Sequence, residues 1–213
     1  VTNIENEIDP SIPFVLVNPN NPDGKLFQPK YLEELLEKIR KANGFLILDE
    51  SFMDGTPDMS LRFDGCRDNV IVIRSFGKFF GLPGLRLGFA YGDNHYINKV
   101  SRLVGPWPIS SSSLLIARKA MLDTVWIGAT ITDLKMKSTA LSNFLSDQKL
   151  KIVGDCYFFK TIEVDSASQM HKALANHGIW TRIFNYNQKW LRMGLTKNKF
   201  EFEYLANTIM DIS

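Results

Sequence analysis

The chain has 213 residues, with 25 lysines and arginines against 23 aspartates and glutamates, and 45% of its residues are hydrophobic. This nearly neutral balance, a net charge of +2, excludes a disordered tail and a protein that coats nucleic acid. A chain of this size buries roughly 70% of the surface that its unfolded form exposes, which leaves room for one full core and a smaller second one. We therefore expect one or two domains.

The cysteines and the uncharged segments narrow the class of protein further. Cys66 and Cys156 stand in no CxxC or cysteine-histidine pattern, which argues against a disulfide framework and against a zinc site. The longest uncharged stretch, residues 103–117, contains Pro106, Pro108 and four consecutive serines, so it is too short and polar to span a bilayer. The acidic first ten residues are unlike a signal peptide. We predict a cytoplasmic protein that binds neither membranes nor nucleic acid.

Three short apolar runs dominate the first part of the chain, at residues 13–17, 45–48 and 70–73. They lack the polar alternation of a half-exposed sheet and are typical of strands buried on both faces, as in a parallel sheet. Between the first two runs, residues 29–39 have leucines and an isoleucine at helical spacing, with Gly44 as the stop. A strand, helix and strand in this order predict a doubly wound α/β domain.

After Arg86 the pattern changes to one more strand at 87–91 and then to helices at 94–104 and 114–121. The serine run 110–113 is expected to cap the second of these helices. A long linking helix is predicted over 122–146, because its apolar residues fall on one stripe: Ile127, Ile131, Leu134, Leu141 and Leu145.

The last part of the chain has the pattern of a smaller α+β unit. Its strands are expected near 157–164 and 190–194, and its helices at 166–177 and 197–212. We therefore place the larger α/β domain at residues 1–121 and the smaller C-terminal domain, linking helix included, at 122–213.

Each of the three buried strands carries a distinctive polar residue at or just past its carboxyl end. These are Asn21 in NPNNPDG, Asp49 in LILDE, and Ser75 with Lys78 in IRSFGK. In an open parallel sheet, ligands bind at this edge. Taken singly, each residue has a plainer explanation: NPNNPDG is a turn sequence, Asp49 could cap a helix, and Lys78 could be a solvated surface lysine. Their joint order and spacing favour a site for a compact anionic ligand.

The same residues resemble the motifs of the class I/II aminotransferase family, the pyridoxal-phosphate enzymes of fold type I. The matching segments are Asn21-Pro22-Asp23-Gly24, Asp49-Glu50, Ser75-Phe76-Gly77-Lys78, Arg86, and Arg192 in WLRMGL. The resemblance covers essentially the whole chain. It implies a large domain with a mainly parallel sheet, incomplete at its N-terminal side, followed by a smaller α+β domain.

The resemblance also implies roles for the residues around the cofactor, pyridoxal 5'-phosphate. Lys78 would attack the cofactor aldehyde through its neutral amine and then act as a general base. Asp49 would pair with the pyridine nitrogen and keep it protonated, so that the ring can accept electrons. Asn21 would hydrogen-bond the ring oxygen, and Ser75 and Arg86 would hold the phosphate.

Two arginines of the C-terminal domain are implied in substrate binding, together with Asn21. Arg192 matches the family arginine that grips the substrate carboxylate, and Arg182 in GIWTRIF matches a second arginine that serves substrates carrying a phosphate. Plainer explanations are a strand-surface position for Arg182 and a domain-packing ion pair for Arg192. Two arginines suit a substrate with two anionic groups, without deciding which arginine takes which group.

One position departs from the usual transaminase pattern. Where that pattern has a tyrosine, this chain has Phe52 in the run Asp49-Glu50-Ser51-Phe52, and a phenyl ring donates no hydrogen bond to the cofactor oxygen. The substitution resembles the branch of the family that decarboxylates L-threonine O-3-phosphate in cobalamin biosynthesis. That branch is our first reading of the chain, and histidinol-phosphate-type or other transaminases are the alternative.

The chain also looks truncated, because the sequence begins at Val1 and the family's first cofactor loop has no counterpart here. A third reading is therefore an inactive remnant of the fold. Since family sites lie at subunit interfaces, the resemblance implies a homodimer that acts on a small phosphorylated amino acid.

Overall fold

The computed structural model describes residues 9, 12–61 and 68–212, so that Cys66 and most of the acidic N-terminal stretch lie outside the described residues. The chain divides into two compact units, of which the first comprises residues 1–19 and Leu26–Gly128. The second comprises Asn20–Lys25 and Ala129–Ser213. This division differs from the sequence boundary between 121 and 122 in two ways, and each has a local cause.

The first difference concerns the start of the long helix α4 (Thr124–Asp147), which begins two residues later than expected. Asp123 caps this helix, because its Oδ1 accepts a hydrogen bond of 3.0 Å from the backbone N–H of Trp126. The Trp126 ring then packs against Phe79 and Phe80, with centroids 5.5 and 5.9 Å away. These contacts place the first turn of α4 in the first unit. The second difference, the loop 20–25, concerns the site and is described below.

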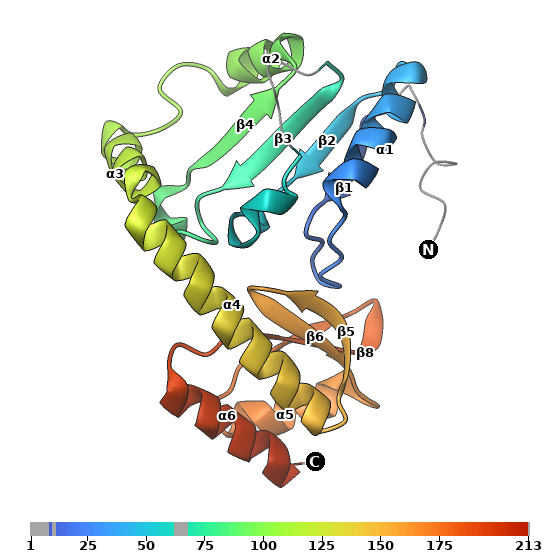
Figure 1. Ribbon diagram of the computed structural model, residues 1–213, viewed down its shortest axis with the longest axis vertical. Coiled ribbons are helices and arrows are strands. Elements are labelled where there is room, and N and C mark those ends of the chain that lie inside the picture. The colour runs from blue at the N-terminus through green and yellow to red at the C-terminus, as the bar shows by residue number, and fades with distance from the viewer. Residues whose placement is uncertain (1–8, 10–11, 62–67, 213) are drawn as a thin grey trace. The chain divides into compact units, whose positions relative to one another are not determined.

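The described part of the first unit is built on a four-stranded sheet in the order β1-β2-β3-β4 (Figure 1). The three apolar runs form its parallel strands, and β4 pairs antiparallel with β3. The prediction of a largely parallel sheet is confirmed. The strand bounds are β1 (Phe14–Val17), β2 (Leu46–Asp49), β3 (Val70–Ser75) and β4 (Gly88–Gly92).

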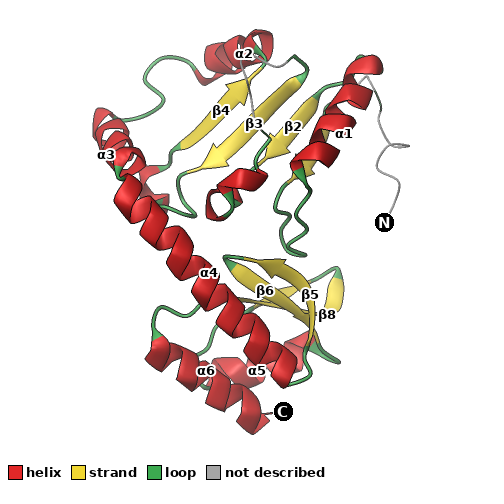
Figure 2. Cartoon of the chain, in the orientation of Figure 1, coloured by secondary structure: helices red, strands yellow, loops and turns green. Residues whose placement is uncertain are grey.

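Helix α1 (Pro29–Lys41) covers one face of this sheet (Figure 2), and it begins at Pro29, the first residue of the predicted helix. Its apolar stripe is fully removed from solvent against the strands. The resulting core contains Leu32, Leu35, Leu36 and Ile39 of the helix and Leu16, Leu46, Leu48, Val70 and Val72 of the sheet. Burial of this stripe is what fixes the crossover helix to the sheet.

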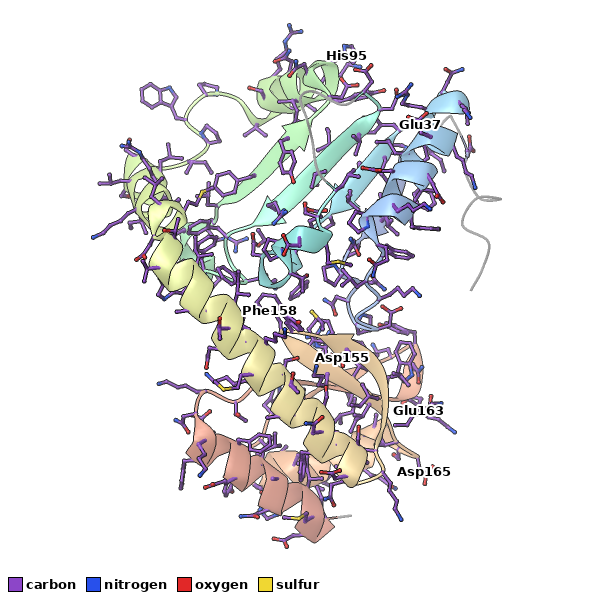
Figure 3. All side chains as sticks on the ribbon, viewed as in Figure 1. Glu37, His95, Asp155, Phe158, Glu163 and Asp165 are labelled. Carbon is purple, nitrogen blue, oxygen red and sulfur yellow. The ribbon has the colours of Figure 1, made fainter. Side chains whose placement is uncertain are left out.

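Beyond the sheet and α1, the described part of the first unit contains further helices. Helices α2 (Asn94–Val104) and α3 (Ser111–Leu122) follow β4, and Figure 3 shows His95 at the outer side of α2. The serine run caps α3 as predicted, since Ser110 Oγ accepts a 3.1 Å hydrogen bond from the Ser113 N–H. The described part of this unit also contains three single turns of 3-10 helix: η2 (Met53–Gly55), η3 (Pro57–Met59) and η4 (Pro83–Leu85).

The described part of the second unit contains an antiparallel sheet in the order β5-β6-β8-β7, with helices packed on it (Figure 2). Leu141 and Leu145 of the predicted α4 stripe are fully buried in its core. The bounds are β5 (Lys151–Cys156), β6 (Phe159–Glu163), α5 (Ala167–Asn176), β7 (Arg182–Phe184), β8 (Asn187–Gly194) and α6 (Lys199–Ile212).

The sequence reading missed β5 and β7. A turn at Tyr157 and Phe158 separates β5 from β6, so the predicted strand 157–164 corresponds to β6 alone. Within β5 the thiol of Cys156 is free and buried, and burial raises its pKa. No helix among the described residues is long and apolar enough to cross a membrane.

Candidate cofactor and substrate sites

The carboxyl end of β2 delivers Asp49, whose side chain is held by the turn that follows the strand. Its Oδ1 accepts two hydrogen bonds from Ser51, one from the backbone N–H at 2.9 Å and one from the hydroxyl at 2.5 Å. The residue is half-buried. A carboxylate fixed in this way keeps its second oxygen in one direction, as a partner of a protonated ring nitrogen requires.

The carboxyl end of β3 delivers Ser75 and, one tight turn later, Lys78. The turn is fixed from both sides: Phe76 is buried and stacked on Phe80 with centroids 4.2 Å apart, and the Gly77 N–H donates to Ser75 Oγ at 3.3 Å. The Lys78 side chain is exposed, and its Nζ lies 5.1 Å from the centroid of the Phe52 ring. Phe52, which stands where the usual transaminase pattern has a tyrosine, is therefore a neighbour of the candidate nucleophile.

Arg86 follows η4 in a left-handed conformation, with φ 51° and ψ 41°, just before β4 begins. Its guanidinium is exposed and donates a long hydrogen bond of 3.4 Å to the Pro83 carbonyl. The Phe76 N–H donates to the Leu87 carbonyl at 3.2 Å, which places Arg86 beside the Ser75–Lys78 turn.

The strand register brings these residues to one edge of the first unit. Asp49 is level with Ile73, two residues before Ser75, and Ser75 is level with Gly88. The edge thus carries a fixed carboxylate, a hydroxyl, a primary amine and a guanidinium, and it is the edge where open parallel sheets bind ligands.

The loop that carries Asn21, residues 20–25, belongs to the second unit although it follows β1 in the chain. Two glycines permit a close backbone approach between this loop and β5. A Cβ on Gly24 would lie 2.6 Å from the Asp155 nitrogen, and one on Gly154 would lie 2.7 Å from the Asp23 carbonyl carbon. The Thr161 hydroxyl also donates to the Pro22 carbonyl at 2.5 Å. Because the loop docks on β5 in this way, residues 20–25 belong to the second unit, whereas the sequence predicts them in the first domain, 1–121.

Asn21 contacts Arg192 of β8, whose guanidinium donates to the Asn21 Oδ1. Arg182 of β7 is the direct register partner of Arg192, so both side chains leave the same face of the sheet. Partial burial, and then the positive charge of Arg182, lower the pKa of Arg192. The Arg192 guanidinium also lies over the Phe159 ring, 5.1 Å from its centroid.

The structure therefore divides the predicted residues between its two units. The first unit brings together Asp49, Phe52, Ser75, Lys78 and Arg86, and the second brings together Asn21, Arg182 and Arg192.

Sequence reasoning missed the Asn21–Arg192 contact. The signals for it were the glycines of NPDG and IVGD, which are the places where two backbones can approach closely.

The residues of the first unit fit pyridoxal phosphate by their chemistry. An aldehyde needs a primary amine, a pyridinium nitrogen needs a carboxylate, and a phosphate needs hydroxyl and guanidinium donors. Lys78, Asp49, Ser75 and Arg86 supply this set on one sheet edge.

Fold and residues together define a known class. The chain belongs to the aminotransferase class I and II family, whose model matches residues 1–209, and this family depends on pyridoxal phosphate. The predicted family, fold class and cofactor are thereby confirmed.

The chain is similar to both decarboxylases and aminotransferases of this family. The chain is 34% identical over 195 residues to a threonine-phosphate decarboxylase of Pseudomonas aeruginosa, covering 90% of this chain and 59% of the relative. It is 32% identical over 218 residues to a histidinol-phosphate aminotransferase of Hydrogenobaculum, covering 97% and 58%. The structure of histidinol-phosphate aminotransferase from Sinorhizobium meliloti in complex with pyridoxal-5'-phosphate has a TM-score of 0.78 at 19% identity, covering 94% of this chain and 58% of that one. The chain thus spans less than two thirds of these proteins.

Proposed function

We propose that the protein acts as a pyridoxal-phosphate-dependent decarboxylase of L-threonine O-3-phosphate, yielding aminopropanol phosphate in cobalamin biosynthesis. The observation that carries this proposal is the pair Arg182 and Arg192, set directly opposite each other on β7 and β8. Like charges in this arrangement destabilise a sheet when no ligand lies between them, so the pair favours a ligand with two anionic groups. Threonine phosphate carries a carboxylate and a phosphate.

The relatives and Phe52 point in the same direction. Threonine-phosphate decarboxylases of Pseudomonas aeruginosa and of a Sinorhizobium species are each 34% identical to this chain. Phe52 offers no phenol to the cofactor, as in the branch that the sequence resembles. Its ring instead lies beside the Lys78 amine.

When bound, the cofactor supplies an electron sink for the bond that breaks at the substrate Cα. In the proposed mechanism Lys78 would hold the cofactor and move a proton at its Nζ. Asp49 would keep a proton on the ring nitrogen, and Ser75 and Arg86 would bind the phosphate by charge-assisted hydrogen bonds. By the family resemblance, Asn21 would hydrogen-bond the ring oxygen.

The two substrate arginines select the reaction by orientation. Whichever bond stands perpendicular to the cofactor ring is the one that breaks, and Arg182 and Arg192 hold the anionic groups that fix this orientation. An enzyme that presents the carboxylate bond releases CO₂, whereas one that presents the Cα–H bond transfers the amino group.

Product analysis tests the proposal. Purified protein with pyridoxal phosphate and threonine phosphate should release one CO₂ for each aminopropanol phosphate formed, with no requirement for an oxo acid. Amino transfer to 2-oxoglutarate without CO₂ would contradict it. That outcome would favour a histidinol-phosphate-type transaminase, the second candidate, which is motivated by the 32% identical relative.

We also propose that the protein forms a homodimer. Exposed apolar side chains on the helices and the loop that follow β4 in the first unit support this, since Leu103, Trp107, Leu115, Leu122 and Val125 are 87%, 92%, 69%, 68% and 83% exposed. Sedimentation equilibrium should give twice the chain mass, and replacement of Trp107 and Leu115 by glutamate should give a monomer.

A further inference from the structure

A network of buried charges lies directly behind the cofactor edge of the first unit. Its centre is Arg74, whose guanidinium contacts Glu50 Oε2 at 2.9 Å, Asp54 Oδ1 at 2.8 Å and Ser60 Oγ at 2.8 Å. Glu50 has no exposed surface, and its carboxylate also accepts from the Ser60 hydroxyl at 2.7 Å and the Leu61 N–H at 3.0 Å.

The network joins the three segments that present the site residues. Glu50 follows Asp49 at the end of β2, and Arg74 precedes Ser75 at the end of β3. Asp54 lies in η2, in the turn that carries Phe52, beyond the carboxyl ends of β2 and β3 (Figure 1). One guanidinium thus ties the two strand ends and the intervening turn to each other.

Stabilisation of the fold does not by itself explain the network. Burial raises the pKa of the Glu50 and Asp54 carboxyls, more than the nearby guanidinium lowers it. Moreover, Arg74 Nε is buried and has no hydrogen-bond partner among the described residues, and an orphaned donor destabilises the fold. Buried ion pairs of this kind are often replaceable by apolar side chains without loss of stability. The network is therefore better explained by the positions in which it holds the neighbouring residues.

We propose that Arg74, with Glu50 and Asp54, positions the cofactor residues: it holds Asp49, Phe52 and Ser75 in the register that lets them bind one cofactor. Arg74 is a positioning residue that contacts neither cofactor nor substrate. This inference rests on the proposed function, because it assigns the network a purpose in cofactor binding. It adds Arg74 and Asp54, which lie outside the motifs of the sequence, and it gives a role to Glu50, which the Asp49-Glu50 motif contained without assigning one.

The test compares Arg74→Met with Ile39→Ala, a control in the same unit whose side chain is fully buried on α1 away from the edge. Two quantities are measured: the dissociation constant for pyridoxal phosphate, by absorbance titration, and the hydrogen exchange of the Ser51 and Gly77 amides in cofactor-free protein. These amides donate to Asp49 and Ser75, so they report the two site residues directly.

Arg74→Met should weaken cofactor binding about tenfold or more, because small displacements of positioned groups have large effects. It should also speed exchange of both amides beyond any change in global stability. Ile39→Ala should lower stability with little change in either quantity. Arg74→Lys, which keeps the charge but not the fork of donors, should rescue only part of the loss.

Unchanged affinity and unchanged amide exchange in Arg74→Met would overturn the proposal, and so would losses that merely match those of Ile39→Ala at equal stability. If Arg74→Met does not fold, Glu50→Gln, which keeps the shape of the side chain, replaces it with the same expectations. If the native chain does not bind pyridoxal phosphate, the proposed function fails. The amide exchange still decides whether the network positions Asp49 and Ser75.

Discussion

Arg182 and Arg192 face each other across the β7–β8 ladder, and the charge of Arg182 helps to lower the pKa of Arg192. Directly opposed like charges are unfavourable in a sheet without a ligand between them. The pair should therefore lower the stability of the ligand-free protein and strengthen its binding of an anionic ligand. A variant with a neutral side chain at position 182 lets the two effects be measured separately.

Arg182→Ala should stabilise the ligand-free protein against urea by roughly 0.2–1 kcal/mol, because it removes this repulsion. The same change should weaken binding of threonine phosphate at least about tenfold, since a charge-assisted contact to an anion is lost. Urea titration and calorimetry measure the two effects. Equal stability together with unchanged affinity would leave Arg182 as an ordinary surface arginine.

Gly154→Ala should destabilise the second unit by about 1–3 kcal/mol, because the added Cβ would meet the backbone of Pro22 and Asp23, which has no rotamer to adjust. It should also displace the loop that presents Asn21 to Arg192. Gly128→Ala is the matched control, since a Cβ there enters open space on α4. The control should stabilise α4 slightly. Chemical denaturation that ranks the two variants in the opposite order would refute the close-approach argument.

The buried carboxyl of Glu50 predicts a pH dependence. Its pKa is raised above the ordinary 4.5, chiefly by burial, so between pH 4.5 and the folded pKa the folded protein keeps a proton that the unfolded chain has released. The stability that this group contributes is fully present below pH 4.5 and is lost as pH rises through the folded pKa. Glu50→Gln should remove this decline from a plot of unfolding free energy against pH.

Glu163 provides a control of opposite sign. A hydrogen bond from Lys151 lowers its pKa, so its contribution is present above pH 4.5 and is lost as pH falls through the folded value. Glu163→Gln should therefore flatten the acid side of the same plot. A Glu50→Gln curve parallel to that of the native protein would contradict the assignment.

The sequence was informative wherever burial alone decides structure. The apolar runs and the α1 stripe predicted the parallel strands and their crossover helix, and the order of Asn21, Asp49, Ser75 and Lys78 predicted the family. Contacts between segments that are distant in the chain could not be predicted from the sequence. The docking of loop 20–25 on β5 depends on the position of Gly24 opposite Asp155 and of Gly154 opposite Asp23. The ion pair between Arg74 and Glu50 could be predicted only if the pairing of β2 with β3 were known.

The central claim is that Lys78 attaches pyridoxal phosphate in this chain. Its most direct test is the absorbance spectrum of the purified protein after incubation with the cofactor and removal of the excess. We expect a band near the visible edge in the native protein, and its disappearance in Lys78→Ala while the fold is retained by circular dichroism. A native chain without such a band, or a Lys78→Ala variant that keeps it, would contradict the claim.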